Sequence, residues 1–532
     1  MLRILTKFQQ GSDRKANLLA LSSFLLFAIA ICALAFSRSF MILGTETDYL
    51  GGFVPDAERF LRGEPLQLPY HPPLYPLVIA PIWLVVRNWF TTGLVVSVVS
   101  SIGLLGVSYL LCKKVWSTAA GLGAIFGLVA SPVFLTYSAL ATSDVFFTFL
   151  YWSAFLLATI AVEQNKWRYW LATGVVAGVV LLTRTNGLPV LLLLAAPLVA
   201  VSGPVTQRAK SAGMMGAGVM IVVAAWVLFA VATDSRFAPE YTHGSLAQNY
   251  FAPEGGRYTG PERRVLEQQF GNVLEVIAHD PVHVAKTYVR DLAILVRRIF
   301  YHGQLLAFPA SHLALPGLLV LLLGTTSRMG ILIVVVSILH VLLLNFAVFA
   351  DRFFLFLTPL LGAGAGVLLE RMLELTKARG ARIRLAAIGV TGLLVVAGVS
   401  EALRETVPAL HADDSLFAAV AKAQPLVASN ATVVGFRPQI AYYLDADFVL
   451  FPPRIETPAE LRQFLLSAKK EGPVFMSFGR YERRRLHIAG VSDWQGAQGA
   501  PEWLVPIAQA PAPDDWTLYE FQSTGEVAPQ VK

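Results

Sequence analysis

The stretch TETDYLGGFVPDAERFLRGEPLQLPYHPPLYPLVIAP, residues 45–81, follows the first long apolar segment and decides the fold of the chain. It begins with an acidic loop that contains Asp48, continues through a short helix signal, and ends in His71 followed by two prolines. Prolines favour the first turn of a helix, so the histidine precedes a stiffened entry into the membrane. An acid and a cation-capable side chain in this setting suit chemistry on a lipid-borne anionic substrate.

The composition excludes an ordinary soluble protein. Hydrophobic residues make up 55% of the chain and charged residues 14%, against about 25% charged residues in globular domains. Apolar windows of about 20 residues, the length that crosses a bilayer, recur along most of the N-terminal three quarters. We expect about eleven crossings, at residues 18–38, 91–112, 118–137, 145–163, 169–184, 187–203, 212–233, 309–326, 329–349, 354–372 and 384–401.

Basic residues occur in alternate short loops between these spans. The opposite loops carry almost only Arg184 and Arg352. The positive-inside rule explains this bias and the net charge of +7, so membrane lipids are expected as partners and nucleic acid is not. With the N-terminus inside, the cytoplasmic clusters are Lys113/Lys114, Lys166/Arg168, Arg208/Lys210, Arg328 and the run Arg371, Lys377, Arg379, Arg382 and Arg384.

The long loops then lie outside. Residues 74–86 are apolar but too short to span, which predicts an interfacial or re-entrant helix. The Gly/Pro-rich tract at 237–264 is either an ordered flap or disorder. From Pro281 to Tyr301, apolar residues recur at helical spacing, which predicts an amphipathic helix on the outer leaflet.

The last part of the chain, residues 405–532, is soluble in character, which divides the protein into a membrane domain at 1–404 and an outer domain at 405–532. We interpret residues 499–513 as a Pro/Ala linker. The alternation of strand and helix signals predicts a small α/β domain. The expected strands are 431–436, 446–451, 473–478 and 516–521, with helices at 414–427 and 458–470.

Three charged residues lie at the outer ends of predicted spans. Asp144 opens the fourth span in ALATSDVFFTFL, where an acid also complements the helix dipole. Arg184 in LLTRTNGLPV and Arg352 in FADRFFLFLTP lie on the side where topology disfavours positive charge. Anchoring at the interface would explain either arginine alone, whereas an anion at headgroup level explains why both lie on this side.

HPPLYPLVIAP at 71–81 and the segments around Asp144, Arg184 and Arg352 resemble the bacterial GT-C glycosyltransferases related to protein mannosyltransferases and to the lipid A aminoarabinose transferase. The resemblance implies an all-α polytopic GT-C-like fold with interfacial helices and a small extracytoplasmic α/β domain. It also implies a transferase of the bacterial inner membrane. Such an enzyme moves a hexosyl or pentosyl group, with inversion, from a polyprenyl-phosphate donor to a lipid, lipopolysaccharide, glycan or protein acceptor.

Inverting transfer needs a carboxylate that takes the acceptor proton. Asp48 is the candidate for this base because it lies close to the mouth of the first span. Asp144 matches a second acid of the family, and the base is left open between Asp48, Glu46 and Asp144. Tyr49, Glu46 and Arg59 are candidate acceptor-side or loop residues.

The donor phosphate needs cationic partners. In the family, a basic residue at the His71 position lies near this phosphate, and Tyr75 follows in the same motif. Arg184 and Arg352 would stabilise the negative charge of the leaving phosphate. We therefore assign these four residues to donor binding.

The sequence has no Walker A loop and no dinucleotide-binding glycine motif between a strand and a helix, which favours a lipid-linked donor over a nucleotide sugar. Its histidines show no metal-ligand spacing, so no cofactor is assigned, and a divalent metal stays open. An O-antigen ligase-like transferase with a lipid-diphosphate donor is the nearest alternative. A transporter is the alternative from another class, but transporters place polar residues near the bilayer midplane.

Overall fold

The computed structural model describes most of the chain. Residues 239–243 and 252–264 of the Gly/Pro-rich tract lie outside the described residues. The described ranges are 14–41, 45–69, 71–238, 244–251, 269–301, 305–346, 350–377, 381–452, 455–470, 472–483, 486–494, 498–510 and 515–523.

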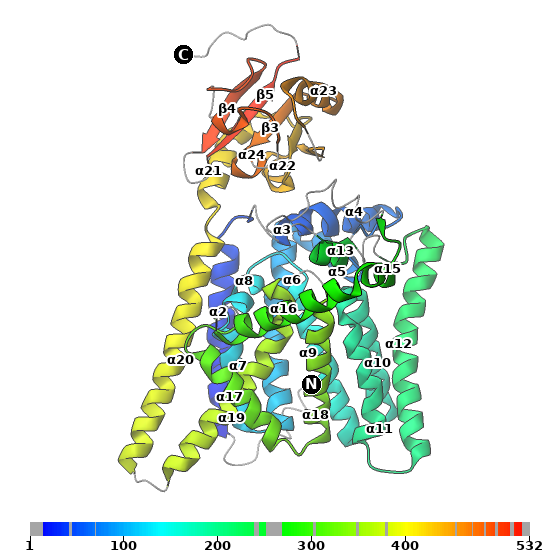
Figure 1. The fold of residues 1–532 in the computed structure, drawn as a ribbon, viewed down its shortest axis with the longest axis vertical. Coiled ribbons are helices and arrows are strands. Elements are labelled where there is room, and N and C mark those ends of the chain that lie inside the picture. The colour runs from blue at the N-terminus through cyan, green and yellow to red at the C-terminus, as the bar shows by residue number, and fades with distance from the viewer. Residues whose placement is uncertain are drawn as a thin grey trace. The chain divides into compact units, whose positions relative to one another are not determined.

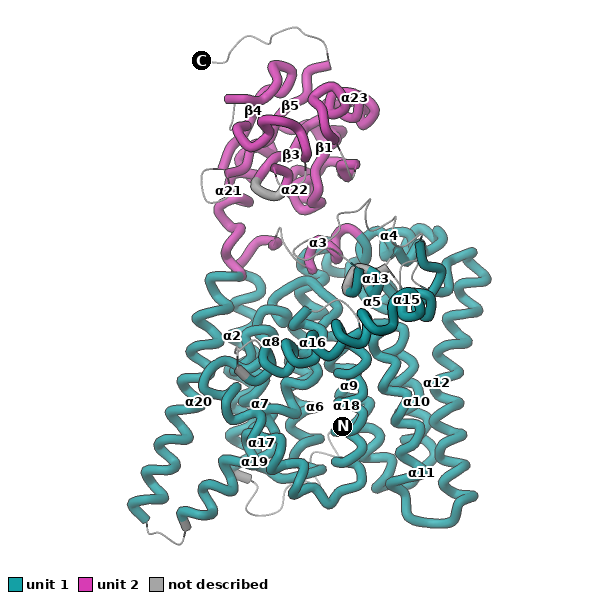
Figure 2. The backbone as a smooth tube through the Cα atoms, in the orientation of Figure 1, with its two compact units in different colours: residues 1–37, 52–256, 266–409 teal, residues 38–51, 257–265, 410–532 magenta. Residues whose placement is uncertain are grey.

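The chain forms two compact units, which Figure 2 colours separately. The final helix of the membrane domain, α20 (Ala381–Leu410), continues past the division that we expected at residue 405. The residues that directly follow the first span, 38–51, belong to the unit that contains the C-terminal domain. The first unit comprises residues 1–37, 52–256 and 266–409, and the second comprises residues 38–51, 257–265 and 410–532.

The first unit is helical, and its long helices run side by side (Figure 1). Each predicted span coincides with an apolar helix or with a pair of consecutive helices. The elements are α2 (Arg14–Phe36), α4 (Val54–Arg62), α5 (Leu74–Val86), α6 (Trp89–Val115), α7 (Thr118–Val129), α8 (Pro132–Ser138), α9 (Asp144–Gln164), α10 (Trp167–Thr183), η3 (Thr185–Ala195), α11 (Ala196–Ala200), α12 (Val205–Thr233), α13 (Gly244–Phe251), α15 (Val273–His279), α16 (Pro281–Tyr301), α17 (Ala310–Gly324), α18 (Arg328–Leu344), η4 (Asp351–Leu357), α19 (Thr358–Lys377) and α20.

Helix length limits how many of these elements qualify as spans. Within the described part of the chain, six helices are long and apolar enough to cross a membrane, or seven if the bent pair α7 and α8 is one span. Shorter apolar helices, among them α10, α17 and α18, occupy other predicted spans. The protein is therefore a multi-pass membrane protein, and the count of eleven stays a prediction.

The span expected at 118–137 is not one straight helix. Its two halves, α7 and α8, meet at an angle of 69°. Pro132 removes a backbone donor at the start of α8, and the Ser131 hydroxyl caps the new helix by accepting the Phe134 N–H at 3.1 Å. The spans expected at 187–203 and 354–372 likewise begin as 3₁₀ helices, η3 and η4, before they become α-helical.

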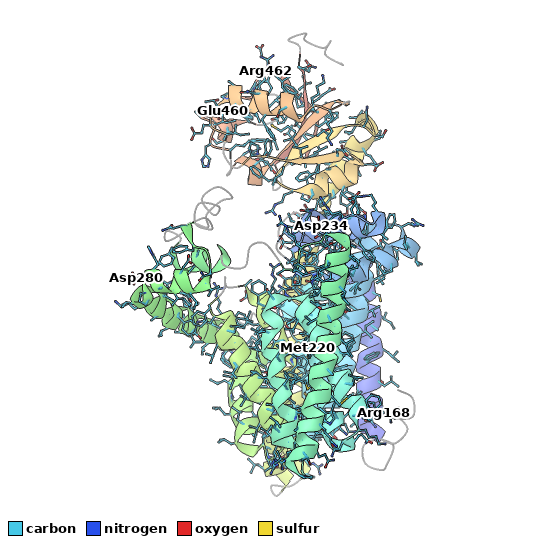
Figure 3. All side chains as sticks on the ribbon, turned by 90° about the vertical axis from the view of Figure 1, so that its right-hand side faces the viewer. Arg168, Met220, Asp234, Asp280, Glu460 and Arg462 are labelled. Carbon is cyan, nitrogen blue, oxygen red and sulfur yellow. The ribbon has the colours of Figure 1, made fainter. Side chains whose placement is uncertain are left out.

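Two predicted outer-loop helices have the expected bounds. Helix α5 covers Leu74–Val86, and the amphipathic helix α16 covers Pro281–Tyr301 and crosses the long helices obliquely (Figure 1). On α16, Val284, Leu295 and Ile299 are buried, as their helical spacing predicts. Figure 3 shows the two ends of the helix bundle, with Arg168 at one end and Asp234 at the other.

Glycines bring the backbones of α7 and α19 into contact. Gly123 and Gly127 on α7 face Gly362 and Gly366 on α19, with four-residue spacing on both helices. A Cβ at Gly127 would lie 2.6 Å from the Cα of Gly362, closer than real Cβ atoms come to their neighbours. Small residues at this spacing are how membrane helices pack closely, because the bilayer gives no hydrophobic drive for association.

The second unit contains a five-stranded sheet in the order β2-β1-β3-β5-β4. Strands β2, β1 and β3 are parallel, and β5 and β4 continue the sheet in antiparallel fashion. Thr432 of β1 pairs with Asp447 of β2 and with Val474 of β3. The elements are α3 (Thr45–Asp48), η2 (Tyr49–Phe53, shared with the first unit), α21 (Asp414–Ala423), η5 (Gln424–Leu426), β1 (Thr432–Gly435), α22 (Pro438–Leu444), β2 (Asp447–Leu450), α23 (Pro458–Ala468), β3 (Val474–Phe478), α24 (Arg480–Arg483), η6 (Val491–Asp493), β4 (Leu504–Ala510) and β5 (Trp516–Phe521).

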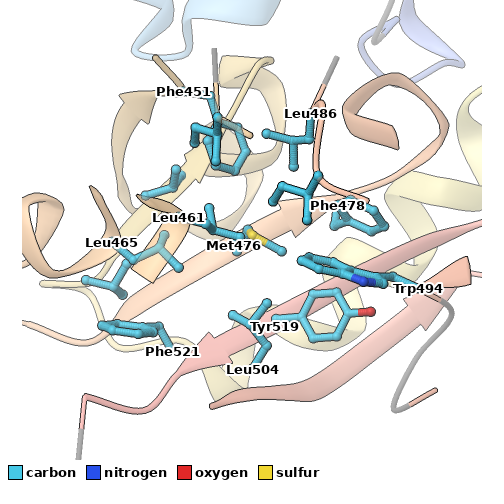
Figure 4. Packing of buried hydrophobic residues seen from close by; sticks show 14 of the residues in the cluster. Phe451, Leu461, Leu465, Met476, Phe478, Leu486, Trp494, Leu504, Tyr519 and Phe521 are labelled. Carbon is cyan, nitrogen blue, oxygen red and sulfur yellow. The ribbon is translucent and has the colours of Figure 1, made fainter. Parts of the chain in front are cut away.

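One face of this sheet packs on α23 around Met476, Leu461 and Tyr519 (Figure 4). The interpretation of 499–513 as a linker was wrong, because strand β4 covers Leu504–Ala510 in this segment. Pro506 lacks a backbone donor, and the pairing of β4 with β5 shifts between Pro506 and Ala508. An edge strand with a bulge accommodates such a proline.

The glycine contact predicts opposite effects for two identical substitutions. Gly127→Ala should lower the free energy of unfolding by about 1–3 kcal/mol, because the added methyl group meets backbone atoms of α19. Gly389→Ala on α20, where a Cβ would meet nothing within 4 Å, should raise it by up to about 1 kcal/mol. Thermal unfolding of the two purified variants in detergent measures the difference, and a similar shift for both would contradict the packing.

Candidate functional site

A buried ion pair joins the start of α9 to the end of α10. The Arg184 Nη1 group donates to Asp144 Oδ1 at 2.5 Å, and Asp144 Oδ2 accepts the Thr142 hydroxyl at 2.5 Å. The side chain of Asp144 is 3% exposed and that of Arg184 is 17% exposed. Asp144 also lies in the first turn of its helix, where a negative charge is favoured. Two predicted site residues, 40 positions apart, therefore meet.

The backbone around Arg184 explains how its side chain reaches Asp144. Arg184 ends α10 in an extended conformation, with φ −152° and ψ 137°. Its carbonyl accepts the Gly187 N–H at 3.0 Å, which closes the turn that starts η3. A side chain at Gly187 would meet Val180 and Phe147, so glycine allows the turn to pack against α9 and α10.

Phe353 brings the second predicted arginine to the same place. The Arg352 guanidinium lies 5.0 Å from the centroid of the Phe353 ring, and the Arg184 guanidinium lies 5.2 Å from it. The two cations thus share one aromatic ring, whose face attracts positive charge. Asp351 directly precedes Arg352 in η4, and its Oδ1 atom lies 3.9 Å from Nη1 of Arg298 on α16.

The 3₁₀ helix η4 holds Arg352 and Phe353 in place through its buried residues. The Phe356 carbonyl accepts the indole N–H of Trp152 on α9 at 2.9 Å. The Phe356 ring stacks on His340 of α18 at 4.0 Å, in a cluster that includes Tyr151. Because α9 and α18 both contact η4, Arg352 and Phe353 are positioned by packed helices and not by a loose loop.

The charges of this cluster act on one further polar group. The Tyr137 hydroxyl, on the short helix α8, lies within electrostatic range of Asp144, Arg184, Asp351 and Arg352. Acids and bases from four separate chain segments therefore converge at one end of the helix bundle. This convergence defines the candidate anion site.

The predicted residues of the first loop form a second, aromatic cluster in the same unit. The His71 ring is buried, stacks on Phe53 at 4.2 Å, and has Nε2 3.6 Å from Asp56 Oδ2. Phe53 meets Tyr75 edge-on at 4.9 Å, and Tyr75 lies 6.0 Å from Phe146 of α9. This chain of rings connects the His71 motif to the helix that carries Asp144.

Asp56 has a role that the sequence did not reveal. Its carboxylate is buried and accepts the backbone N–H groups of Gln67 at 2.9 Å and Leu68 at 3.0 Å. It thereby fixes the segment that leads from α4 to His71. An aspartate near the start of a short helix gave no signal for partners eleven and twelve residues later.

The remaining candidates of the first loop lie in different surroundings. Glu46 is fully buried and pairs with Arg38 at 2.5 Å, and its carboxylate also accepts the Met41 N–H at 2.7 Å. Asp48, half-buried, ends α3, and the buried Tyr49 begins the π-helical turn η2. Arg59 is half-buried in the last turn of α4.

The neighbourhood of Arg59 contains a carboxylate with altered acidity. Burial raises the pKa of Glu58 above its ordinary value, while the indole N–H of Trp89 and the Arg62 guanidinium lower it. The Trp89 Nε1 group donates to Glu58 Oε1 at 3.0 Å. In the described ranges, no group of three or more His, Cys, Asp or Glu side chains is arranged to hold a metal ion.

A known protein family matches the part of the chain that carries several of the predicted site residues. Residues 70–230 match the sequence model of the family described as dolichyl-phosphate-mannose-protein mannosyltransferase. This segment contains His71, Tyr75, Asp144 and Arg184. No curated protein sequence matches the chain significantly.

Solved structures cover almost the whole chain. ArnT from Cupriavidus metallidurans bound to undecaprenyl phosphate aligns with a TM-score of 0.58 and 13% identity, over 96% of this chain and 99% of that chain. The apo state of the same ArnT gives a TM-score of 0.59 and 14% identity over the same shares. Archaeal oligosaccharyltransferase AglB from Archaeoglobus fulgidus, in complex with an inhibitory peptide and a dolichol-phosphate, gives 0.55 and 12% over 88% and 70%. The GT-C fold and the resemblance expected from the sequence are thereby confirmed.

The buried ion pair predicts a stability difference between two carboxylates of the first unit. Asp144→Asn should lower the free energy of unfolding by about 3 kcal/mol, because it leaves the Arg184 guanidinium largely buried without its counter-ion. Glu401→Gln breaks an exposed pair with Arg404 on α20 and should leave the melting temperature unchanged. Equal melting temperatures for both variants would show that the Asp144 pair adds nothing to stability.

Proposed function

From the GT-C fold and the match to the mannosyltransferase family model, we propose that the chain is an integral membrane glycosyltransferase with a polyprenyl-phosphate-linked sugar as its donor. The observation that carries the proposal is the pair of guanidinium groups, Arg184 and Arg352, on the Phe353 ring. A phosphate provides several acceptor oxygens at once, so both guanidinium groups can bind it in this apolar setting. ArnT has been seen with undecaprenyl phosphate and AglB with a dolichol-phosphate, which supports this ligand class.

The two arginines suit the leaving phosphate better than the neutral sugar. As the bond between the sugar and the phosphate breaks, negative charge grows on the phosphate oxygens. Fixed guanidinium groups in a site of low dielectric stabilise this charge without reorganising. The Arg184 guanidinium also contacts two aromatic rings, with the centroids of Phe353 and Phe147 at 5.2 and 6.0 Å. The donor would replace part of the bonding that Asp144 gives Arg184.

Asp48 is the proposed acceptor-activating base. It lies close to the mouth of the first span, where a carboxylate can take the proton of an acceptor hydroxyl. Asp48 ends a short helix next to a π-helical turn, a geometry that often marks functional sites. The assignment of His71 and Tyr75 to the donor remains part of the proposal. Their burial next to Asp56 and Phe53 also gives them a supporting role in the first loop.

The proposed reaction is a single displacement. The acceptor hydroxyl oxygen attacks the anomeric carbon, its proton passes to the Asp48 carboxylate, and the bond from the anomeric carbon to the phosphate oxygen breaks. The products are the glycosylated acceptor, with inverted configuration, and a polyprenyl phosphate that carries the electron pair of the broken bond. The acceptor is a lipid, lipopolysaccharide, glycan or protein, and the transferred group is a hexosyl or pentosyl unit.

The direct test of this function compares membranes of a host that carries the gene with membranes of a deletion strain. Mass spectrometry of their glycolipids and glycans should show one sugar addition that depends on the gene. The purified protein should then transfer that sugar from its polyprenyl-phosphate form and release the phosphate lipid. Transfer that proceeds only from a lipid-diphosphate donor would overturn the proposal.

The reaction is proposed for the outer face of a bacterial inner membrane. The charge bias of the short loops puts Lys210 inside and the C-terminal domain outside. Reporter fusions at Lys210 and Lys532 should therefore report opposite sides of the membrane. Like signals from the two fusions would contradict this orientation.

The donor assignment predicts the behaviour of the arginine variants. Arg184→Ala and Arg352→Ala should each weaken binding of sugar-free undecaprenyl phosphate and slow transfer, at a cost of roughly 2–4 kcal/mol in the transition state. Lysine at either position should restore part of the loss, because it keeps the charge but not the planar fork. Arg168→Ala, at the opposite end of the bundle (Figure 3), is the control. Parental binding by both alanine variants would leave the arginines as membrane anchors only.

The base assignment predicts a large loss of turnover with intact folding. Asp48→Asn keeps the shape of the side chain but cannot take a proton, so the transfer rate should fall by about 10²-fold or more. Asp445→Asn, an exposed aspartate of the same compact unit, should transfer at the parental rate. Near-parental turnover of Asp48→Asn would move the role to Glu46 or Asp144.

A further inference from the structure

The segment that carries Asp48 is built into the C-terminal domain. Residues 38–51 and 410–532 form one compact unit, although more than three hundred residues separate them in the chain (Figure 2). Such a grouping requires specific contacts, and helix α22 supplies several of them. The following inference rests on the proposed role of Asp48.

Gln439 on α22 contacts the residue that directly precedes Asp48. Its Nε2 group donates to the Met41 carbonyl at 2.8 Å and to the Thr47 hydroxyl at 2.9 Å. The side chain is completely buried, so these bonds are shielded from competition with water. This one amide group therefore connects Met41 with Thr47, the residue immediately before the proposed base.

The start of the segment is held by two other side chains of the domain. The Tyr443 hydroxyl accepts the Phe40 N–H at 3.0 Å, and Asp414 Oδ1 accepts the Ser39 N–H at 3.1 Å. The Phe40 ring lies edge-on against Tyr442 at 5.4 Å and against Tyr443 at 6.0 Å. Phe40 is 1% exposed, so its ring anchors the segment in the domain core.

The segment is also closed on itself. Arg38 and Glu46 form a bidentate ion pair with distances of 2.5 and 3.0 Å, and both side chains are fully buried. Glu46 accepts the Met41 N–H at 2.7 Å. A fully bonded buried pair of this kind fixes geometry. The segment is therefore tied internally through Glu46 and externally to Gln439, Tyr443 and Asp414, all upstream of Asp48.

We propose that helix α22 of the C-terminal domain positions the Asp48 carboxylate, and that Gln439 is the positioning residue. The C-terminal domain then contributes to catalysis, because it sets the distance between the Asp48 carboxylate and the acceptor hydroxyl. A base displaced by about 1 Å loses much of its effect, whereas donor binding by the arginines is unaffected.

The kinetic test compares three variants of the full-length protein in detergent. Gln439→Ala and Gln439→Glu both remove the amide donor, and the second keeps the shape of the side chain. For both, we expect kcat to fall about tenfold while the KM for the polyprenyl-phosphate donor stays within about twofold. Gln463→Ala, an exposed glutamine on α23, should match the parent in both constants.

The glutamate variant adds a readout that a purely structural role would not change. Its carboxyl group regains an O–H donor on protonation, and burial favours the protonated form. Its activity relative to the parent should therefore recover as the pH is lowered, whereas the relative activity of Gln439→Ala should stay constant. Parallel pH profiles for the two variants would overturn the positioning role.

Hydrogen exchange tests the anchoring without any activity measurement. Tyr443→Phe removes the acceptor of the Phe40 N–H and should speed amide exchange in residues 38–41, and Gln439→Ala should speed it in residues 45–51. Unchanged exchange in both variants would overturn the anchoring. If the parent transfers no sugar while exchange responds as expected, the proposed function fails and the anchoring stands. Normal kcat in Gln439→Ala alongside an active parent would sink the positioning inference alone.

Discussion

The backbones of α7 and α19 touch, and the candidate site depends on this contact. Gly127 and Gly362 leave no room for a Cβ between the helices, so α19 cannot move away from α7 or slide along it without losing the fit. Helix α19 is the continuation of η4, the 3₁₀ helix that carries Arg352. The hydrogen bond from Trp152 to η4 then links α9, which carries Asp144, to α19 and through it to α7.

The cost of charge in an apolar bundle explains the arrangement of the site. An unpaired guanidinium among lipid-facing helices is expensive, so Arg184 lies against Asp144 and against aromatic rings. The same constraint acts on the buried Arg38 and Glu46, which neutralise each other in the second unit. The first pair, unlike the second, lies beside another arginine on a shared ring. Two arginines on one aromatic ring thus distinguish the proposed anion-binding site from the Arg38–Glu46 pair.

Helix positions were predictable where length and periodicity are the only determinants. Helices α5 and α16 have the expected bounds because a short apolar run and a helical apolar stripe each permit one interpretation. Strand β4 was missed because Pro506 and its neighbours have the composition of a linker, and a bulge at a sheet edge leaves no signature in the sequence. Asp144, Arg184 and Arg352 were singled out through motif and topology, and the structure brings them together. Phe353 and the ties of Gln439 were not, because contacts between distant segments depend on tertiary packing.

The pairing of Arg184 with Asp144 has a consequence for the end of the proposed catalytic cycle. Each transfer leaves a spent lipid whose phosphate carries more charge than the donor had, and arginines that bind it tightly would trap it. The Asp144 carboxylate competes with this phosphate for the Arg184 guanidinium, which lies 2.5 Å away. In the proposed cycle, Asp144 would pair with Arg184 again as the polyprenyl phosphate dissociates. The guanidinium would then not be left without a counter-ion next to the bilayer. In the proposed cycle, this competing carboxylate would shorten the lifetime of the product complex and favour rapid turnover.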